Sequence, residues 1–173
     1  LLLHPFYPET TLNAFFNQAA RFIYHPALIT PNPLGEGWAW DDYPYYYAAE
    51  RSAFPIYGNA VQATLKDNTL ELTPSFFEKM AARDSVGSKF KRLHSANAFS
   101  YNLSQWQKKD TLTRPFITSD SLFVKLLSES TVNEVILADQ PRDDLPWEEL
   151  YTDDDTPLYR ALLQDSDNGI AEA

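Results

Sequence analysis

Two stretches near the middle of the chain alternate between apolar and polar residues, and this alternation constrains the fold more than any other feature. They run from Asn59 to Leu65 and from Thr69 to Thr73, and Lys66-Asp67-Asn68 joins them. Successive side chains of a strand point to opposite faces, so each stretch presents one apolar face and one polar face. Two such stretches joined by a short polar connection indicate a β-hairpin.

Three further stretches alternate in the same way and follow the hairpin. They are Lys89 to Leu93, Ala98 to Leu103 and Thr111 to Ile117. Strands that expose one face to water belong to antiparallel sheets, whereas the strands of parallel sheets are buried on both faces. We therefore expect three antiparallel strands here.

Helical patterns flank this β-rich middle. Apolar residues recur on one helical face between residues 8 and 22, and Ser119 is placed to cap a helix that continues to Leu127. Thr156-Pro157 opens a final helix that we expect to end near Ser166. Helices on both sides of an antiparallel middle predict an α+β fold.

Shorter elements complete the expected order of the chain. Ser75 is placed to cap a short helix that contains Phe77, and apolar runs at residues 27–29 and 132–137 predict two short strands. The acidic, proline-containing residues 139–155 are typical of a loop or crossover.

Composition excludes several classes of function. Of the 173 residues 44% are hydrophobic, which suffices for a sizeable core, and the net charge of −10 argues against nucleic acid as a partner. Without cysteine there is no disulfide, thiol nucleophile or thiolate metal site. The three histidines, His4, His25 and His94, have no metal-binding spacing, so we expect no metal and no cofactor.

The ends of the sequence indicate an internal part of a longer protein. The leucines at the start follow no basic segment of the kind that opens a signal peptide, and no Met precedes them. No apolar run reaches the ~18 residues that a membrane-spanning helix needs.

One group of residues matches part of a serine acyl-transfer site. Ser166-Asp167-Asn168 has the pattern S-D-N, one of three motifs of penicillin-recognising serine enzymes, beside S-x-x-K and K-T-G. In such a site a lysine one helical turn from the serine nucleophile takes its proton. The S-D-N serine extends the proton path and its asparagine orients the substrate. A plain helix cap is the alternative interpretation of these three residues.

The other two motifs are missing from the chain. None of the five glycines completes K-T-G or a close variant. One formal S-x-x-K occurs at Ser88 to Lys91, but its alternation favours a strand or loop, where the two side chains cannot share a helical face. We therefore expect no nucleophile here.

A second group of residues lies between Gly35 and Tyr47 and is rich in aromatic and acidic side chains. It reads GEGWAWDDYPYYY. An aromatic loop packed over a core is one interpretation. The other is a recognition surface, in which aromatic faces take apolar stems or sugar rings and a carboxylate takes an ammonium group.

Taken together, these two groups resemble a signature of the S13 family of serine peptidases. These class C, low-molecular-mass penicillin-binding proteins have D-alanyl-D-alanine carboxypeptidase and endopeptidase activity. The resemblance rests on GWAWDD, Ser52-Ala53-Phe54, Asn59 at the head of a strand, and the final S-D-N. Ala48-Ala49-Glu50, Phe54 and Gly169 depart from the family pattern.

The resemblance implies a role for five residues. Ser166 would be the proton-relay serine and Asn168 the substrate-orienting amide. Asp42 would hold the amino end of a diamino-acid side chain on the cell-wall peptide, and Trp40 and Tyr47 would line the same pocket. The nucleophile would lie upstream of this chain and K-T-G downstream, so the chain would be inactive alone.

The same resemblance implies a domain order. Residues 1–60 would open an inserted domain that carries GWAWDD, residues 61–118 would form a β-rich inserted domain or middle, and residues 119–150 would return to the first. Residues 151–173 would lead back, through the last helix, to a transpeptidase-like catalytic domain.

The family also implies partners and a location for the longer protein. Its partners would be peptidoglycan stem peptides and β-lactams, in the periplasm or cell envelope, and an isolated fragment could self-associate through uncovered apolar surface. The alternative is a non-catalytic module whose aromatic and acidic surface binds the cell wall or another protein. A parent protein that has lost its catalytic motifs is a third hypothesis.

Overall fold

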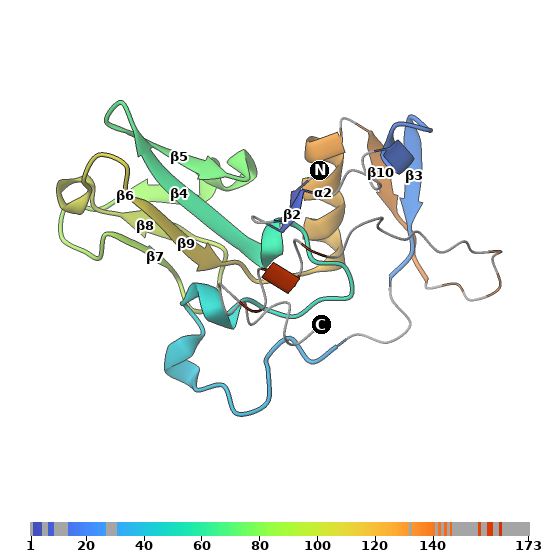
Figure 1. Ribbon diagram of the computed structural model, residues 1–173, viewed down its shortest axis with the longest axis horizontal. Helices are drawn as coiled ribbons and strands as arrows, with labels where there is room; N and C mark the ends of the chain where they lie inside the picture. The colour runs from blue at the N-terminus through green and yellow to red at the C-terminus, as the bar shows by residue number, and fades with distance from the viewer. Residues whose placement is uncertain are drawn as a thin grey trace. The chain divides into compact units, whose positions relative to one another are not determined.

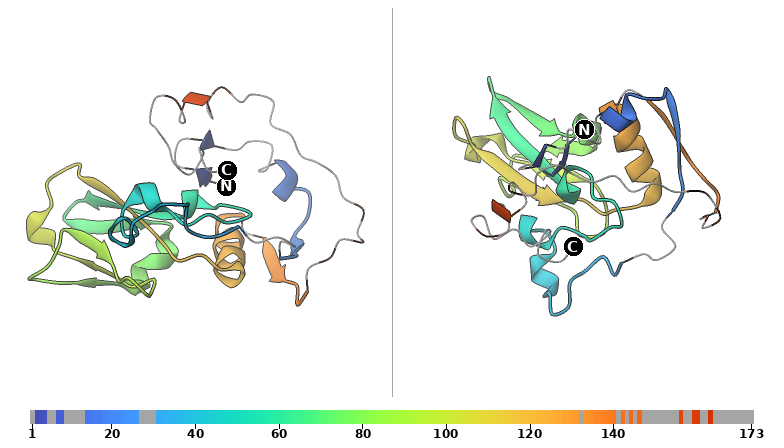
Figure 2. Two further views of the ribbon diagram at one scale, coloured as in Figure 1. Left: turned by 90° about the horizontal axis from the view of Figure 1, so that it is seen from below. Right: turned by 45° about the vertical axis from the view of Figure 1, so that its right-hand side comes forward.

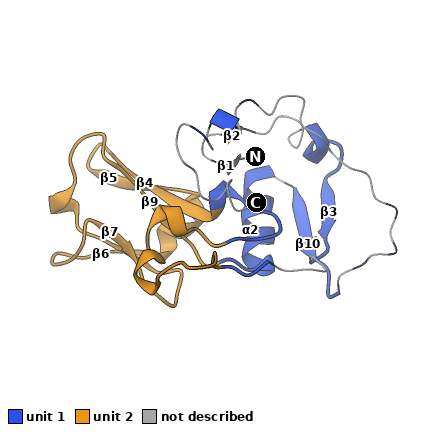
Figure 3. Ribbon diagram, turned by 60° about the horizontal axis from the view of Figure 1, so that its bottom comes forward, with its two compact units in different colours: residues 1–33, 51–58, 118–173 blue, residues 34–50, 59–117 orange. Residues whose placement is uncertain are grey.

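The computed structural model describes most of the chain and divides it into two compact units. The described residues are 2–4, 7–8, 14–26, 31–131, 133–140, 142, 144, 146, 156, 159–160 and 163. Unit 1 comprises residues 1–33, 51–58 and 118–173, and unit 2 comprises residues 34–50 and 59–117 (Figure 3). Helices and mostly antiparallel sheets occur together, which confirms the predicted α+β class.

The predicted hairpin is present in unit 2 and forms part of a three-stranded antiparallel sheet. Strands β4 (Ala60–Lys66) and β5 (Thr69–Thr73) are joined by a turn in which Asp67 and Asn68 have φ values of 47° and 62°. Asp and Asn tolerate this left-handed backbone better than most residues. Strand β9 (Thr111–Pro115) pairs with the other edge of β4, giving the order β5-β4-β9 (Figure 1).

A second three-stranded sheet in unit 2 corrects part of the sequence analysis. Strand β7 (Phe90–Arg92) pairs antiparallel with β8 (Phe99–Tyr101), as expected. Strand β6 (Ala81–Arg83) was not predicted, and it pairs parallel with the other edge of β8. Three residues are too few to show an alternation in the sequence, and only the pairing with β8 defines this strand.

The core of unit 2 is built from phenylalanine rings of both sheets and their connections. The ring centroid of Phe77 lies 5.6 Å from that of Phe99 and 5.1 Å from that of Phe116, and Phe90 stacks on Phe99 at 5.5 Å. Phe77 comes from the 3₁₀ helix η4 (Ser75–Met80), whose N-cap is Pro74 without a side-chain hydrogen bond. Ser75 is therefore the first residue of this helix and not its cap.

Unit 1 contains a short parallel sheet covered by one helix. Strands β3 (Arg21–Tyr24) and β10 (Glu134–Leu137) pair in parallel, and α2 (Asp120–Thr131) lies beside them in Figures 1 and 2. The chain between β3 and β10 includes both segments of unit 2 before it reaches α2. Two more strands, β1 (Leu2–His4) and β2 (Tyr7–Pro8), pair antiparallel.

Helix α2 begins where the sequence predicts. The Ser119 hydroxyl accepts a hydrogen bond from the Leu122 backbone N–H at 3.2 Å, which satisfies one of the free donors of the first turn. Its buried face includes Phe123, whose ring centroid lies 4.6 Å from that of Tyr24 and 5.0 Å from that of Phe54.

The first predicted helix is too long. Residues 14–16 are helical, but Arg21–Tyr24 form β3, so Phe22 belongs to a strand. Its ring still packs against those of Phe15 and Phe16, at 5.4 Å and 5.0 Å between centroids. Phe22 therefore packs in the expected apolar cluster from a strand and not from a helix, because pairing with β10 determines the local backbone.

Other expectations lie partly or wholly outside the described residues. The predicted strand at residues 27–29 and the stretch 147–155 lie outside the described residues. Of the predicted last helix, four residues are described and have helical backbone: Thr156, Tyr159, Arg160 and Leu163. Within the described part of the chain, no helix is long and apolar enough to cross a membrane.

Candidate functional site

The loop from residue 34 to residue 50 of unit 2 carries the aromatic and acidic segment. Two short 3₁₀ helices organise it, η1 (Trp40–Asp42) and η2 (Tyr46–Ala48). Gly37 has φ of +81°, a conformation that side chains disfavour, and a Cβ on Gly35 would lie 2.5 Å from the indole of Trp38. Both glycines therefore have local reasons to be glycine, and they let the chain turn closely beside Trp38.

An open pocket of about 470 Å³ lies on this loop. Six residues line it: Trp40, Asp41, Asp42, Pro44, Tyr45 and His94. Its volume is within the range of small-ligand sites. Its combination of aromatic faces and two carboxylates suits a ligand that carries an apolar stem and a positive charge.

The carboxylate of Asp42 is oriented from two sides. The Tyr47 hydroxyl donates to Oδ1 at 3.0 Å, and the Ala39 backbone N–H donates to Oδ2 at 3.3 Å. The hydrogen bond to Asp42 raises the pKa of Tyr47, so this phenol remains a donor at neutral pH. No lysine or arginine among the described residues forms a salt bridge with Asp42. Its negative charge is therefore held in place and available to a cationic ligand.

Two of the lining residues, Trp40 and His94, stack on each other. The indole of Trp40 and the imidazole of His94 are 3.7 Å apart between centroids with an interplanar angle of 17°, and Tyr43 lies 4.9 Å from the same imidazole. The guanidinium carbon of Arg92 lies 4.6 Å from the centre of the Tyr43 ring, and that of Arg114 lies 5.7 Å from the centre of Tyr45.

The base of the loop is fixed by buried polar contacts. The Tyr43 hydroxyl donates to the buried carboxylate of Glu50. Burial first, and then this hydrogen bond and the charge of Glu50, raise the pKa of Tyr43 to about 12. The Asn59 side chain donates to the Glu50 carbonyl at 2.7 Å and so ties the loop to the start of β4.

The structure brings three of the five predicted site residues together. Trp40 and Asp42 line the pocket, whereas Tyr47 is outside its lining and acts on it through its hydrogen bond to Asp42. Ser166 and Asn168 lie outside the described residues. Sequence reasoning did not find His94, because it follows β7 and reaches Trp40 only through the fold.

The formal S-x-x-K motif does not form a catalytic pair in this structure. Ser88 lies in a loop before β7, and Lys91 lies within that strand. The two residues are not on one helical face, which is the geometry that a lysine base needs in this motif. The expectation of a strand or loop at this position is confirmed.

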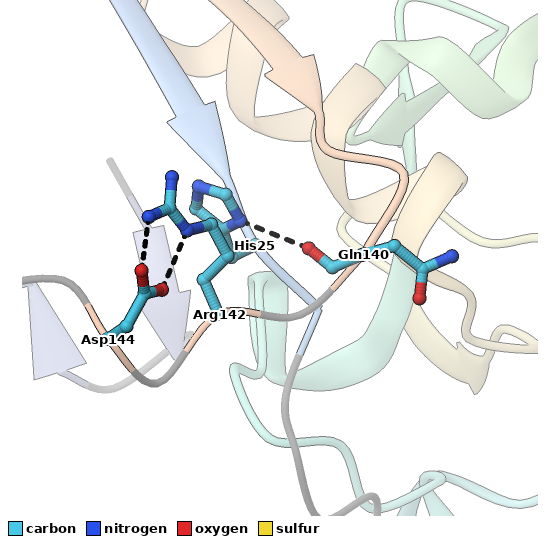
Figure 4. Close-up of polar contacts among 4 residues, drawn as sticks. All are labelled: His25, Gln140, Arg142 and Asp144. Atoms are coloured by element: carbon cyan, nitrogen blue, oxygen red, sulfur yellow. Dashed lines mark hydrogen bonds and ion pairs between the residues drawn. The ribbon is translucent and has the colours of Figure 1, made fainter.

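A polar group in unit 1 is a weaker candidate. Arg142 donates to both carboxylate oxygens of Asp144, at 2.8 Å and 2.6 Å, and the His25 ring contacts the Gln140 carbonyl at 3.2 Å (Figure 4). The Arg142 hydrogen bond lowers the pKa of Asp144. Both partners of the ion pair are exposed. This group is an ordinary surface contact.

Among the described residues, no three histidine, aspartate or glutamate side chains are grouped closely enough to hold a metal ion. Comparison of the sequence with protein-family models and with curated proteins finds no match. The family resemblance therefore rests on the motifs of this chain alone.

Proposed function

We propose that this chain is the substrate-recognition part of a peptidoglycan D-alanyl-D-alanine carboxypeptidase or endopeptidase, and that it is catalytically incomplete alone. The observation that carries the proposal is the carboxylate of Asp42 in an open, aromatic-lined pocket, where it forms no salt bridge with a described lysine or arginine. Within the described residues a tyrosine and a backbone N–H orient it without neutralising its charge. Such a group binds an ammonium ion well, because the ligand loses water and needs a counter-charge.

In the longer protein, this pocket would position the stem peptide for acyl transfer. A serine of S-x-x-K would attack the carbonyl carbon of the penultimate D-alanine while the motif lysine takes its proton. The amine of the terminal D-alanine would leave with a proton relayed through Ser166, and water would then hydrolyse the acyl-serine. Asn168 would orient the peptide. We place this protein in the periplasm or cell envelope, where its substrate is found.

A binding module without catalysis is the second candidate, and the exposure of the aromatic rings favours it. Trp40 is 72% exposed and Tyr46 is 64% exposed. Exposed aromatic faces of this kind suit the apolar faces of sugar rings as well as a peptide stem. The two candidates differ in whether an amine on the ligand is required.

Binding to a matched pair of peptides tests the recognition step. The peptides are stem pentapeptides ending in D-Ala-D-Ala, acetylated at the N-terminus, with the third-position lysine amine either free or acetylated. We expect calorimetry to show binding of the free amine only, and Asp42→Asn to weaken it at least about tenfold. The control is Asp67→Asn, which makes the same charge change in the β4–β5 turn, away from the pocket lining.

Two outcomes would count against the proposal. Equal binding of both peptides would remove the ammonium contact, and binding of a peptide-free glycan strand alone would favour the module. Covalent labelling by a fluorescent penicillin tests the catalytic part separately. We expect no labelling of this 173-residue chain, and labelling of the longer protein at a serine upstream of it. Labelling of Ser88 in the chain would contradict the proposal.

A further inference from the structure

A continuous series of contacts leads from strand β9 to the carboxylate of Asp42. The guanidinium carbon of Arg114, a residue of β9, lies 5.7 Å from the centre of the Tyr45 ring. The Tyr45 ring stacks on that of Tyr47, with 5.6 Å between the centroids and an interplanar angle of 3°. The Tyr47 hydroxyl in turn donates to Oδ1 of Asp42 at 3.0 Å. Arg114 is thus connected to the pocket carboxylate through two tyrosines.

Arg114 is itself held by the strands of unit 2. Its Nε atom donates to the Phe90 carbonyl oxygen at 3.1 Å, and its Nη1 atom donates to the Thr113 carbonyl oxygen at 2.9 Å. Phe90 begins β7 and Thr113 is part of β9, and these two strands belong to different three-stranded sheets. A planar guanidinium can donate such hydrogen bonds and interact with an aromatic ring at the same time. The half-buried guanidinium is therefore fixed relative to both sheets.

The two tyrosines of this series are not fixed by burial. Tyr45 is 45% exposed and Tyr47 is 38% exposed. A side chain that faces solvent has room for other rotamers, and ordering it in one rotamer costs conformational entropy. Contacts such as the stack of Tyr45 on Tyr47 therefore influence which rotamer each ring adopts.

We propose that Arg114 is a positioning residue for the ammonium contact of the pocket. By holding Tyr45, it keeps Tyr47 in the rotamer whose hydroxyl reaches Asp42, and so keeps this carboxylate oriented for a cationic ligand. This role rests on the proposed recognition of an ammonium group.

Positioning and charge repulsion predict opposite effects of Arg114 on ligand binding. Arginine is positively charged at neutral pH, so its charge near the pocket repels a cationic ligand. If repulsion were its main effect, removing Arg114 would strengthen the binding of an amine. If Arg114 acts through Tyr45 and Tyr47, removing it weakens binding, because Asp42 is no longer oriented by a fixed donor. The sign of the change therefore separates the two effects.

Three substitutions and one control test the series. Arg114→Met removes the guanidinium and keeps a long apolar side chain, whereas Arg114→Lys keeps a cation that can interact with the Tyr45 ring. Tyr47→Phe keeps the stacked ring and removes the hydroxyl. The control, Arg83→Met, removes the same charge from an exposed arginine of β6 outside the pocket lining. Calorimetry with the free-amine stem pentapeptide measures binding, and a thermal melt checks that each variant is folded.

We expect Arg114→Met to bind about threefold more weakly than the wild type, the size of one lost cation–π contact. Tyr47→Phe should bind about fivefold more weakly, because Asp42 loses a hydrogen bond that orients it. The double variant should also bind about fivefold more weakly, whereas independent effects would multiply to about fifteenfold.

The lysine variant separates this role from a role in stability alone. Arg114→Lys should melt at a lower temperature than the wild type, because lysine lacks the guanidinium fork that donates to the two carbonyl oxygens. It should nevertheless bind the peptide like the wild type, as should the control Arg83→Met. If Arg114→Met does not fold, Arg114→Gln takes its place with the same expectations, since it keeps an amide donor and loses the charge.

The outcomes distinguish this inference from the proposed function. Unchanged or tighter binding by Arg114→Met refutes the role of Arg114, as do losses that multiply in the double variant or a loss in Arg114→Lys equal to that in Arg114→Met. In each of these cases the proposed function stands if Asp42→Asn still weakens binding. If the wild type does not bind the free-amine peptide at all, both the proposed function and the role of Arg114 fall.

Discussion

The two units of the molecule differ sharply in charge, although they belong to one chain. In unit 2, nine lysine and arginine residues balance nine aspartate and glutamate residues, whereas unit 1 has five basic and fifteen acidic residues. The entire net charge of −10 therefore belongs to unit 1. The pocket lies in the neutral unit, so the cation binding that we propose would depend on the placement of Asp41 and Asp42 and not on the overall acidity of the chain.

Two core rings of unit 2 and two sheet residues of unit 1 differ in how completely they are buried. The Phe77 and Phe90 rings of unit 2 are fully buried. In unit 1, Ile23 and Ile136 are register partners in the parallel sheet and are 60% and 40% exposed. Parallel sheets are normally covered on both faces. The predictions below test this contrast between the buried rings of unit 2 and the exposed sheet residues of unit 1.

The largest expected effect is the loss of a core ring from unit 2. Phe77→Ala should lower the free energy of unfolding by about 4 kcal/mol, because a buried phenylalanine leaves a cavity among rings that cannot collapse. Ile23→Ala in unit 1 should cost about 0.5 kcal/mol or less, since the side chain is mostly exposed. Urea unfolding followed by tryptophan fluorescence measures the Phe77→Ala loss, because three of the four tryptophans, Trp38, Trp40 and Trp106, lie in unit 2. Circular dichroism supplies the signal for unit 1, and equal losses would contradict the contrast.

A pair of tyrosines gives the next comparison. Burial is the first cause that raises the pKa of both Tyr43 in unit 2 and Tyr24 in unit 1 to about 12, and Glu50 and Asp120 add to it. An unfolded tyrosine loses its proton near pH 10, before either folded tyrosine does. Both units should therefore lose stability as the pH rises from about 10 to about 12.

The two hydroxyls should not contribute equally at neutral pH. Tyr43 donates to the buried carboxylate of Glu50, whereas the bond from Tyr24 to Asp120 is exposed and 3.3 Å long. Tyr43→Phe should cost about 1.5 kcal/mol and Tyr24→Phe about 0.5 kcal/mol, because the first substitution takes a donor from a buried acceptor. Thermal melts at pH 7 measure both costs. Each variant should also lose part of the alkaline destabilisation, and an unchanged alkaline profile would refute the assignment.

The helix caps extend the comparison to smaller effects. Ser119 caps α2 in unit 1 through its hydroxyl, but Ser75 makes no capping bond at η4 in unit 2. Ser119→Ala should destabilise the chain by about 1 kcal/mol, and Ser75→Ala by much less. Urea titrations of the two variants measure the difference. Similar costs would mean that the hydroxyl bond of Ser119 contributes little to the helix.

Local sequence patterns predict those elements of the structure that are determined by residues close together in the sequence. The β4–β5 hairpin and the Ser119 cap follow from side-chain alternation and from one hydroxyl. Trp40 and Asp42, which the family resemblance implied as site residues, lie two positions apart in one loop, and both line the pocket. The parallel strand β6 could not be predicted in this way, because its partner β8 lies beyond the next strand along the chain.

The supporting groups of the pocket escaped prediction for the same reason. His94, Arg92 and Arg114 contact the aromatic loop from distant parts of the sequence, through the tertiary fold of unit 2. Nothing next to them in the sequence distinguishes them from solvated residues. Phe22 shows a different kind of error. Its apolar pattern is correct but was assigned to a helix, because no local sequence pattern reveals the pairing of β3 with β10.

The smallest expected effect concerns one ion pair in each unit. Lys89 in unit 2 pairs with Asp110 and also lies 5.4 Å from the centre of the Trp106 ring, whereas Arg142 and Asp144 in unit 1 form an exposed pair. The hydrogen bonds from Lys89 and Arg142 lower the pKa of Asp110 and Asp144 respectively. The stability from each lowered pKa is present above about pH 4 and is lost as the pH falls below it.

Asp144→Asn should leave the melting temperature at pH 7 unchanged within error, because water and salt screen an exposed pair. Asp110→Asn should lower it slightly, since Lys89 is also held against an aromatic ring and the Gln107 backbone N–H loses its carboxylate acceptor. Melts at about 0.1 M and about 1 M salt sharpen the test. Only the lower melting temperature of Asp110→Asn should persist at the higher salt, where surface charges are screened. A larger effect from Asp144 would show that the acidic unit depends on this pair, despite its exposure to solvent.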